Sequence, residues 1–258
     1  MKAVILAGGF GTRLSEETDI KPKPMVEVGG RPILWHIMKM YSCHGIKDFI
    51  ICLGYKGYVI KEFFVNYQRH MSDITVNLKD GTIEDHKSRA EDWNVTLVDT
   101  GLNTMTGGRI KGVQDFLKDE EDFCLTYGDG VSDVDITKLI EFHKSHNKIA
   151  TLTSVKAPNR FGVIDSDKTG LINSFKEKPQ EAQDWINGGF FVLNKRVFDY
   201  MNDDKSLVFE SDVLPKITQD KELTSFRHDG FWQAMDTKRD NITLNDIHDK
   251  GKAPWVKW

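Results

Sequence analysis

The sequence predicts an α/β protein with a mixed, mainly parallel central sheet, helices on its faces and a smaller β-rich part. Three observations predict this fold. The run "AVIL" at residues 3–6 is apolar throughout, as in strands buried on both faces. Strand-like and helix-like patterns then alternate up to about residue 150, which is typical of a parallel sheet. From about residue 149 the strand candidates become shorter and follow one another more closely.

The first half contains the alternating elements. A helix is expected over 31–45, because Pro32 stands near its start and Gly45 at its end. A later amphipathic helix covers 135–146, with Asp135 as its N-cap. The other elements expected in this half are strands at 3–6, 47–55, 94–101 and 122–130 and helices at 59–68 and Arg109–Leu117. The polar, weakly patterned residues Ser72–Trp93 are expected to leave the sheet.

The second half begins with strands and ends with helices. Strands are expected at 149–155, 160–165, 171–179 and 188–194, and helices at Ser211–Asp220 and Thr237–Lys250. The polar residues Asp165–Gly170 predict a hairpin turn with Gly170 as its turn glycine. No linker or repeat separates the halves, so 1–258 is expected to form a single domain, with halves at 1–150 and 151–258, on one continuous sheet.

Composition excludes several classes of protein. The formal net charge of −4 argues against a non-specific nucleic-acid binder. No run approaches the roughly 18 apolar residues that a membrane span needs. Of the three cysteines, Cys52 and Cys124 lie in apolar runs and are expected to be buried, reduced thiols. These features predict a cytoplasmic protein of enzyme size.

The stretch "LAGGFGTRL" directly after the first strand predicts a phosphate-binding loop. A dinucleotide fingerprint GxGxxG needs glycine where Leu14 stands, and the downstream prolines oppose a helix that starts at once. A P-loop needs Lys-Ser/Thr after its last glycine, and Arg13 stands near that place. A plain glycine-rich surface turn would not explain why Arg13 follows the glycines or why Lys23 stands between two prolines. A loop whose N–H groups wrap a triphosphate remains, with Arg13 as a planar fork and Lys23 as a point charge on stiff, extended backbone between Pro22 and Pro24.

"LAGGFGTRL…KPKPM" resembles the signature of the sugar-nucleotide pyrophosphorylases, which join a nucleoside triphosphate to a sugar 1-phosphate. Along the whole chain the sequence is similar to the cytidylyl-transferring branch of that family. The stretches that carry this similarity are Arg31–Lys39, "WNVTLVDTG", "TGGR", "TYGDGVSD", "INGGFFVLN" and "GFWQAMDTKRD".

The resemblance implies a reaction and a fold. CTP and α-glucose 1-phosphate would give CDP-glucose and pyrophosphate with Mg²⁺, on the Rossmann-like nucleotide-diphospho-sugar transferase fold. Residues 1–150 would bind the nucleotide, and residues 151–258 would bind the sugar phosphate and supply the C-terminal helices. Family members are commonly homo-oligomers and serve the synthesis of deoxysugars for cell-surface polysaccharide such as the O-antigen of lipopolysaccharide. Both properties are expectations for this chain.

The resemblance also assigns residues. Arg13 and Lys23 are the catalytic candidates, Lys23 as the group that stabilises the pentavalent transition state. Asp129 in "YGDG" and Asp236 in "QAMDT" are the candidate Mg²⁺ ligands. Asp236 also precedes a helical pattern, so its alternative role is an N-cap. The nucleotide-binding candidates are Leu6, Ala7, Gly8, Gly9, Gly11, Thr12, Arg13, Lys23, Thr104, Arg109 and Gly128.

On the sugar side, the candidates are Glu177, Lys178, Asn187 and Gly188. From the residues alone, the alternative for Glu177 and Lys178 is an ordinary solvated charge pair. The glycines at 188 and 189 are equally well explained by a bulge where a strand begins. Arg109 opens a helical pattern and is the candidate for reading the acceptors of cytosine, with a phosphate or surface role left open.

No general base is evident near these residues. A sugar 1-phosphate is already largely dianionic at pH 7, since the second pKa of a phosphate monoester is about 6, so none is needed. His143 and His146 lie on a charged helix face and are expected to face solvent. The alternatives left open are the same fold with UTP, dTTP or another hexose 1-phosphate, a catalytically silent nucleotide-sugar sensor and, least favoured, an NAD-dependent oxidoreductase.

Overall fold

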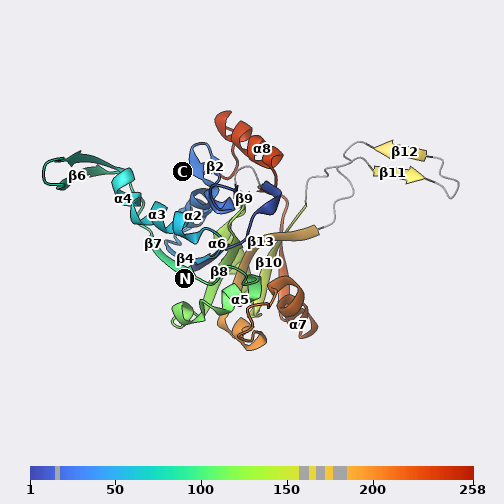
Figure 1. Cartoon of the computed structure of the whole chain (residues 1–258). Coiled ribbons are helices and arrows are strands. Elements are labelled where there is room, and N and C mark those ends of the chain that lie inside the picture. Colours follow the sequence, from blue (N-terminus) through green and yellow to red (C-terminus); the bar gives the residue numbers. More distant parts are fainter. Residues whose placement is uncertain (15–17, 157–162, 167–171, 177–184) are drawn as a thin grey trace.

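One continuous sheet runs through both halves of the chain. The computed structural model describes residues 1–14, 18–156, 163–166, 172–176 and 185–258. Across the sheet the strands are β14 (Leu223–His228), β10 (Ala150–Lys156), β13 (Trp185–Asn194), β8 (Asp122–Tyr127), β1 (Ala3–Ala7), β4 (Asp48–Leu53) and β7 (Asn94–Asp99). Strand β13 runs antiparallel to both of its neighbours, and the other pairs are parallel. The predicted mixed, mainly parallel sheet is therefore confirmed (Figure 1).

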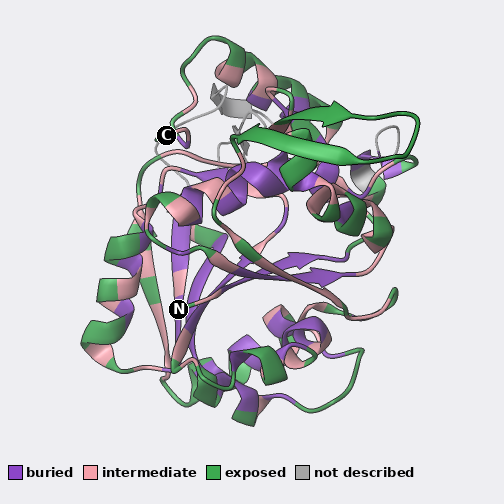
Figure 2. Ribbon diagram, turned by 90° about the vertical axis from the view of Figure 1, so that its left-hand side faces the viewer, coloured by how far each residue is buried: buried purple, intermediate pink, exposed green. Residues whose placement is uncertain are grey.

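Helices cover both faces of this sheet, as the all-apolar strands require. Ala3, Ile5 and Ala7 of β1 belong to one buried cluster, and Val4 and Leu6 belong to another. The first cluster includes residues of α2 (Ile33–Cys43), α3 (Gly57–Val65), α6 (Ile136–His146) and α8 (Lys238–Asp249). The second includes residues of α5 (Thr106–Lys111) and α7 (Leu214–Gln219). Figure 2 shows the sheet as a buried layer between the two sets of helices.

Local signals explain where the long helices begin and end. Helix α2 starts directly after Pro32, and Gly45 follows it with a φ of 82°, a left-handed conformation that favours glycine. Asp135 caps α6 as predicted, because its carboxylate accepts a 3.0 Å hydrogen bond from the N–H of Lys138.

Three predicted helices are interrupted. The helix expected at 59–68 starts earlier, at Gly57, and breaks between α3 and α4 (Tyr67–His70). The helix expected at Arg109–Leu117 is α5 followed by a separate 3₁₀ helix at Gln114–Leu117. The helix expected at Ser211–Asp220 starts as a π-helical turn at Phe209–Val213 and continues as α7.

Several short strands were not predicted. Strand β14 pairs in parallel with β10 at the edge of the sheet. Strands β9 (Gly130–Ser132) and β15 (Trp232–Ala234) form an antiparallel pair next to the sheet, and β2 (Glu27–Val28) pairs with β3 (Arg31–Pro32). Strands of two or three residues are too short to show a hydrophobic period in sequence.

Two hairpins lie outside the sheet. Ser72–Trp93 does leave it, as predicted, but as a hairpin of β5 (Ser72–Val76) and β6 (Ile83–Ser88) that projects from the body (Figure 1). Both strands are exposed almost throughout (Figure 2). Strands β11 (Val163–Ser166) and β12 (Ile172–Lys176) pair antiparallel as predicted, whereas the turn with Gly170 lies outside the described residues.

The predicted burial of two cysteines is confirmed. Cys52 and Cys124 are buried free thiols, and burial raises the pKa of each to about 12. The C-terminal tail packs on the body of the chain, where Trp255 is 1% exposed and stacks on Phe231. In the part of the chain that the structure describes, every helix is too short or too polar to span a bilayer.

Candidate functional site

The candidate site lies where β1 and β8 end, at the carboxyl edge of the sheet. Leu6 is paired with Tyr127 in parallel register, and the N–H of Gly128 donates a 3.0 Å hydrogen bond to the Leu6 carbonyl. The glycine loop after β1 therefore meets the "YGDG" turn after β8. Open α/β sheets bind ligands at this edge.

A cavity of about 550 Å³ opens between these two turns. This volume suits a nucleotide-sized ligand. It is lined by every predicted nucleotide-binding residue whose side chain the structure describes, together with Phe10, Pro24, Leu102, Asn103, Met105, Thr106, Tyr127, Asp129 and Asp236. The backbone of Arg13 lies in a short 3₁₀ helix, Thr12–Leu14, and its side chain is outside the described part of the structure.

A glycine is required at two positions of the loop. Gly11 has a φ of 65°, and a Cβ there would lie 2.9 Å from Cγ2 of Thr18. A Cβ on Gly8 would lie 2.2 Å from Nη1 of Arg109. The loop thus turns sharply and packs its backbone directly against a guanidinium.

Lys23 lies between the two predicted metal ligands. Its Nζ donates a 2.7 Å hydrogen bond to Asp129 Oδ2 and another of 2.7 Å to Asp236 Oδ1. The Lys23 side chain is 12% exposed. Burial by itself lowers the pKa of Lys23, but the charges and hydrogen bonds of the two carboxylates outweigh burial, so the pKa is raised above its usual value. Lys23 is therefore a firmly protonated cation held by two anions.

The backbone at Lys23 differs from the prediction. Pro22 is extended, with φ −66° and ψ 151°, but Lys23 itself begins a 3₁₀ helix, Lys23–Met25, rather than an extended segment. The N–H of Val26 donates to the Lys23 carbonyl at 3.0 Å and closes this turn. A proline fits the first turn of a helix, because the missing N–H would have no partner there.

Backbone pairing positions the two aspartates. The short strands β9 and β15 pair Gly130 with Ala234, and the N–H of Met235 donates to the Asp129 carbonyl at 2.8 Å. These contacts place Asp129 and Asp236 next to each other although they are far apart in sequence. Asp236 is not the N-cap of α8. Thr237 is, because it forms a reciprocal capping box with Asp240.

A second, smaller cavity of about 220 Å³ adjoins the first. Asn187 and Gly188 line it, as does Trp232, whose indole N–H donates to the Gly188 carbonyl at 2.7 Å. Tyr127, Asp129 and Asp236 line both cavities, so the carboxylate pair stands at their junction. Glu177 and Lys178, the other predicted sugar-side residues, lie outside the described residues.

Arg109 lines the larger cavity, but its guanidinium is already engaged. The group donates to the carbonyls of Leu53, Gly8, Gly101 and Leu102 at 2.8–3.2 Å and to the Thr100 hydroxyl at 2.7 Å. Arg109 is 5% exposed, and burial lowers its pKa. The interpretation of Arg109 as a free fork for cytosine needs correction, because these bonds hold the glycine loop to the ends of β4 and β7.

Thr104, the other candidate from this segment, is also tied to the backbone. Its side chain is 6% exposed, and its hydroxyl donates a 2.7 Å hydrogen bond to the Thr100 carbonyl. Thr104 and Arg109 together therefore stabilise the turn after β7 that forms one wall of the cavity.

Sequence reasoning missed a second polar group in the walls. Tyr127 donates its phenolic hydrogen to Glu210 Oε1, and the Thr106 hydroxyl donates to Glu210 Oε2 at 2.6 Å. No local motif marks this contact, because Glu210 comes from the π-helical turn, 83 residues after Tyr127.

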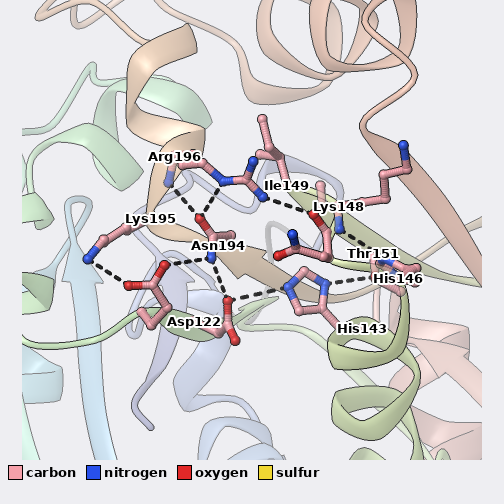
Figure 3. Close-up of polar contacts among 12 residues, drawn as sticks. Asp122, His143, His146, Lys148, Ile149, Thr151, Asn194, Lys195 and Arg196 are labelled. Carbon is pink, nitrogen blue, oxygen red and sulfur yellow. Dashed lines mark hydrogen bonds and ion pairs between the residues drawn. The ribbon is translucent and has the colours of Figure 1, made fainter.

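His143 is buried, which corrects the expectation that it faces solvent. The residue is 2% exposed, with Nδ1 2.9 Å from the Thr151 hydroxyl and Nε2 3.5 Å from Asp122 (Figure 3). His146 is half-buried against the same hydroxyl at 3.0 Å. These groups belong to a polar network at the start of β8, the end of the strand opposite the candidate site. The helix face is charged in sequence, but the rings of both histidines contact the hydroxyl of Thr151 in β10.

Comparison with known proteins identifies relatives along the whole chain. Residues 2–245 match the nucleotidyl transferase family. The chain is 59% identical to glucose-1-phosphate cytidylyltransferase of Salmonella typhimurium and 41% identical to the probable glucose-1-phosphate cytidylyltransferase of Bacillus subtilis. In both cases the match covers 100% of each chain. Mannose-1-phosphate guanyltransferase of Saccharomyces cerevisiae is 31% identical, and 63% of its length is matched.

Solved structures share the fold. HddC from Yersinia pseudotuberculosis superposes with a TM-score of 0.68 at 26% identity, over 96% of this chain and 99% of that one. A putative glucose-1-phosphate thymidylyltransferase from Bacillus anthracis gives a TM-score of 0.72 at 19% identity, over 100% and 97% of the two chains. The second likeness shows the fold alone.

Proposed function

The chain belongs to the nucleotidyl transferase family, and from this premise we propose that it makes CDP-glucose and pyrophosphate from CTP and α-glucose 1-phosphate. The observation that carries the proposal is the junction of two cavities at Tyr127, Asp129 and Asp236. The larger cavity would take CTP and the smaller one the hexose. The reacting phosphates would then meet beside Lys23, the only lysine among the described residues that line either of these two cavities.

The glycine loop would hold the triphosphate. Its residues Gly8–Thr12 line the larger cavity at the end of β1, where backbone N–H groups are available to phosphate oxygens. Arg13 follows this loop and would add a bidentate contact to the phosphates. The base would lie toward Thr104 and Met105, on the wall that Arg109 stabilises.

The reaction needs positioning and charge more than proton transfer. The phosphate of glucose 1-phosphate is largely dianionic at pH 7 and attacks the α-phosphorus of CTP directly, while pyrophosphate leaves. Lys23, protonated and held at the junction of the cavities, would stabilise the charge on the pentavalent transition state. Glu177, Lys178 and Asn187 would hold the sugar phosphate in line.

Two carboxylates with room for phosphate oxygens fit Mg²⁺. Asp129 and Asp236 would hold the ion, since Mg²⁺ in proteins commonly takes one or two carboxylates plus substrate phosphates. When bound, the ion would offset the charge of the triphosphate and of the leaving pyrophosphate. Within this chain, Lys23 bonds one oxygen of each carboxylate, Asp129 Oδ2 and Asp236 Oδ1, so a metal ion held there would share both carboxylates with the ammonium.

A matrix of substrates tests the proposal. Pyrophosphate release is measured with CTP, UTP, dTTP and GTP, each combined with glucose 1-phosphate, mannose 1-phosphate and galactose 1-phosphate. CTP with glucose 1-phosphate should give the highest kcat/KM by at least tenfold. A higher kcat/KM for another pair would keep the family assignment but change the substrates. No pyrophosphate release with any pair would favour a catalytically silent nucleotide-sugar sensor.

A further inference from the structure

A tyrosine lies at the junction of the two cavities, and contacts with neighbouring residues fix the position of its ring. Tyr127 lines both cavities. On one side its ring packs edge-on against Phe191, with centroids 6.2 Å apart. On another it lies against the backbone of Gly189, where a Cβ would come within 2.5 Å of Cδ2 of the ring. Gly189 has a φ of 79°, so both its conformation and this close contact require glycine.

Glu210 fixes the hydroxyl end of this tyrosine. One carboxylate oxygen accepts the Tyr127 hydroxyl hydrogen, and the other accepts that of Thr106. The N–H of Phe209 in turn donates to the Thr106 hydroxyl at 2.9 Å. Burial, and to a smaller extent the charge of Glu210, raises the pKa of Tyr127, so the phenol keeps its proton.

The bond to Glu210 leaves the tyrosine oxygen as a hydrogen-bond acceptor. A phenol has one hydrogen to donate, and Glu210 takes it, so toward any other group Tyr127 acts only as an acceptor. One neighbour already uses it in this way, because Nδ2 of Asn187 lies 3.5 Å from the phenolic oxygen. Asn187 lines the smaller cavity and not the larger one.

We propose that Glu210 is a positioning residue that presents Tyr127, together with Asn187, as a recognition pair for a hydroxyl group of the hexose. The tyrosine oxygen accepts a hydrogen bond from that hydroxyl, and Asn187 completes the pair. Glu210 does not touch the substrate and acts through Tyr127. This inference rests on the proposed function, because it places the sugar in the smaller cavity.

The test uses three variants and steady-state kinetics with CTP and glucose 1-phosphate. Tyr127→Phe keeps the ring and removes the acceptor, so KM for glucose 1-phosphate should rise about three- to tenfold, the effect of one hydrogen bond. KM for CTP should stay within twofold. Glu210→Ala should raise KM for the sugar phosphate at least as much, and Glu210→Gln, which can still bond both hydroxyls, should recover most of the loss.

A double variant distinguishes positioning from general stability. If Glu210 acts through the tyrosine, Tyr127→Phe combined with Glu210→Ala should be no worse than the worse single variant. Ser211→Ala is the matched control, since Ser211 is exposed in the same turn and its hydroxyl bonds only to Asp212 among the described contacts.

The outcomes separate this inference from the proposed function. An unchanged KM for glucose 1-phosphate in Tyr127→Phe, a shift in KM for CTP instead, or independent effects in the double variant would overturn the inference. Absence of CDP-glucose formation by the unmodified protein would instead overturn the proposed function. Thermal unfolding of each variant shows whether a loss comes from the fold.

Discussion

Lys23 donates a 2.7 Å hydrogen bond to Asp129, although 106 positions separate the two residues in sequence. The contact joins the segment after the glycine loop to the turn after β8. It brings a fixed positive charge to the junction of the two cavities.

Replacing Lys23 with methionine should reduce kcat by about 10²- to 10³-fold, the usual effect of removing one group that stabilises transition-state charge. The fold should be retained, since methionine keeps most of the length of the lysine side chain, which is 12% exposed. Initial rates of pyrophosphate release and a circular dichroism spectrum measure the two effects. Lys21→Met is the control, because Lys21 pairs with Glu27 and lines neither cavity. A rate near normal in Lys23→Met would remove Lys23 from the mechanism.

The same substitution should strengthen the binding of a divalent cation. The ammonium of Lys23 and a metal ion compete for the carboxylates of Asp129 and Asp236, so removing the ammonium removes the competitor. Mn²⁺ titrated without substrates and followed by electron paramagnetic resonance should bind Lys23→Met at least fivefold more tightly than the unmodified protein. Asp129→Asn should bind more weakly than either. Equal affinities for all three proteins would mean that Mn²⁺ binds elsewhere.

Two neighbouring glycines should respond differently to alanine. A Cβ on Gly8 would meet Nη1 of Arg109 at 2.2 Å, whereas a Cβ on Gly9 would have no atom within 4 Å. Gly8→Ala must displace a buried guanidinium and should lower the free energy of unfolding by about 2–3 kcal/mol. Gly9→Ala should change it by less than about 0.5 kcal/mol. Urea unfolding without ligand measures both, and equal losses would show that the guanidinium moves aside freely.

Arg109→Lys should affect stability and every nucleotide alike. Lysine cannot replace the fork that bonds four carbonyls, so the free energy of unfolding should fall by about 3 kcal/mol. KM should rise by a similar factor for CTP and for UTP, because the wall of the cavity is loosened as a whole. A selective loss of CTP over UTP would instead restore Arg109 as the residue that reads the base.

The sequence predicts the position of this site better than its internal contacts. Strand ends in a parallel sheet share one edge, so a glycine loop directly after one strand and an aspartate directly after another can meet there, as the loop and Asp129 do. The bonds of Arg109 depend on where carbonyls of separate turns converge, which spacing along the chain does not show. The contact of Glu210 with Tyr127 likewise comes from a π-helical turn that a helical period does not reveal. The exposure of His143 was predicted wrongly, because the sequence does not show that this face of α6 packs against β10.

The last prediction concerns His36, which anchors the C-terminal tail. Its Nε2 lies 2.8 Å from the Val28 carbonyl, and the indole N–H of Trp255 donates to its Nδ1 at 3.3 Å. Because Nδ1 accepts, the ring is neutral with its hydrogen on Nε2, which donates to Val28. Protonation would place a second hydrogen on Nδ1, facing the indole N–H. Burial, aided by His248 and Arg31, lowers the pKa of His36 to about 4.

Acid should therefore weaken the protein through this residue. Between about pH 6.5 and pH 4 the unfolded chain protonates His36 and the folded chain does not, so the free energy of unfolding falls as the pH falls. The full effect of this one group is about 3 kcal/mol and is complete near pH 4. Urea unfolding followed by tryptophan fluorescence at several pH values measures it. His36→Gln, whose amide can donate to Val28 and accept from Trp255, should show a smaller loss over that range. The same pH dependence in both proteins would assign the acid sensitivity to other histidines, such as His143.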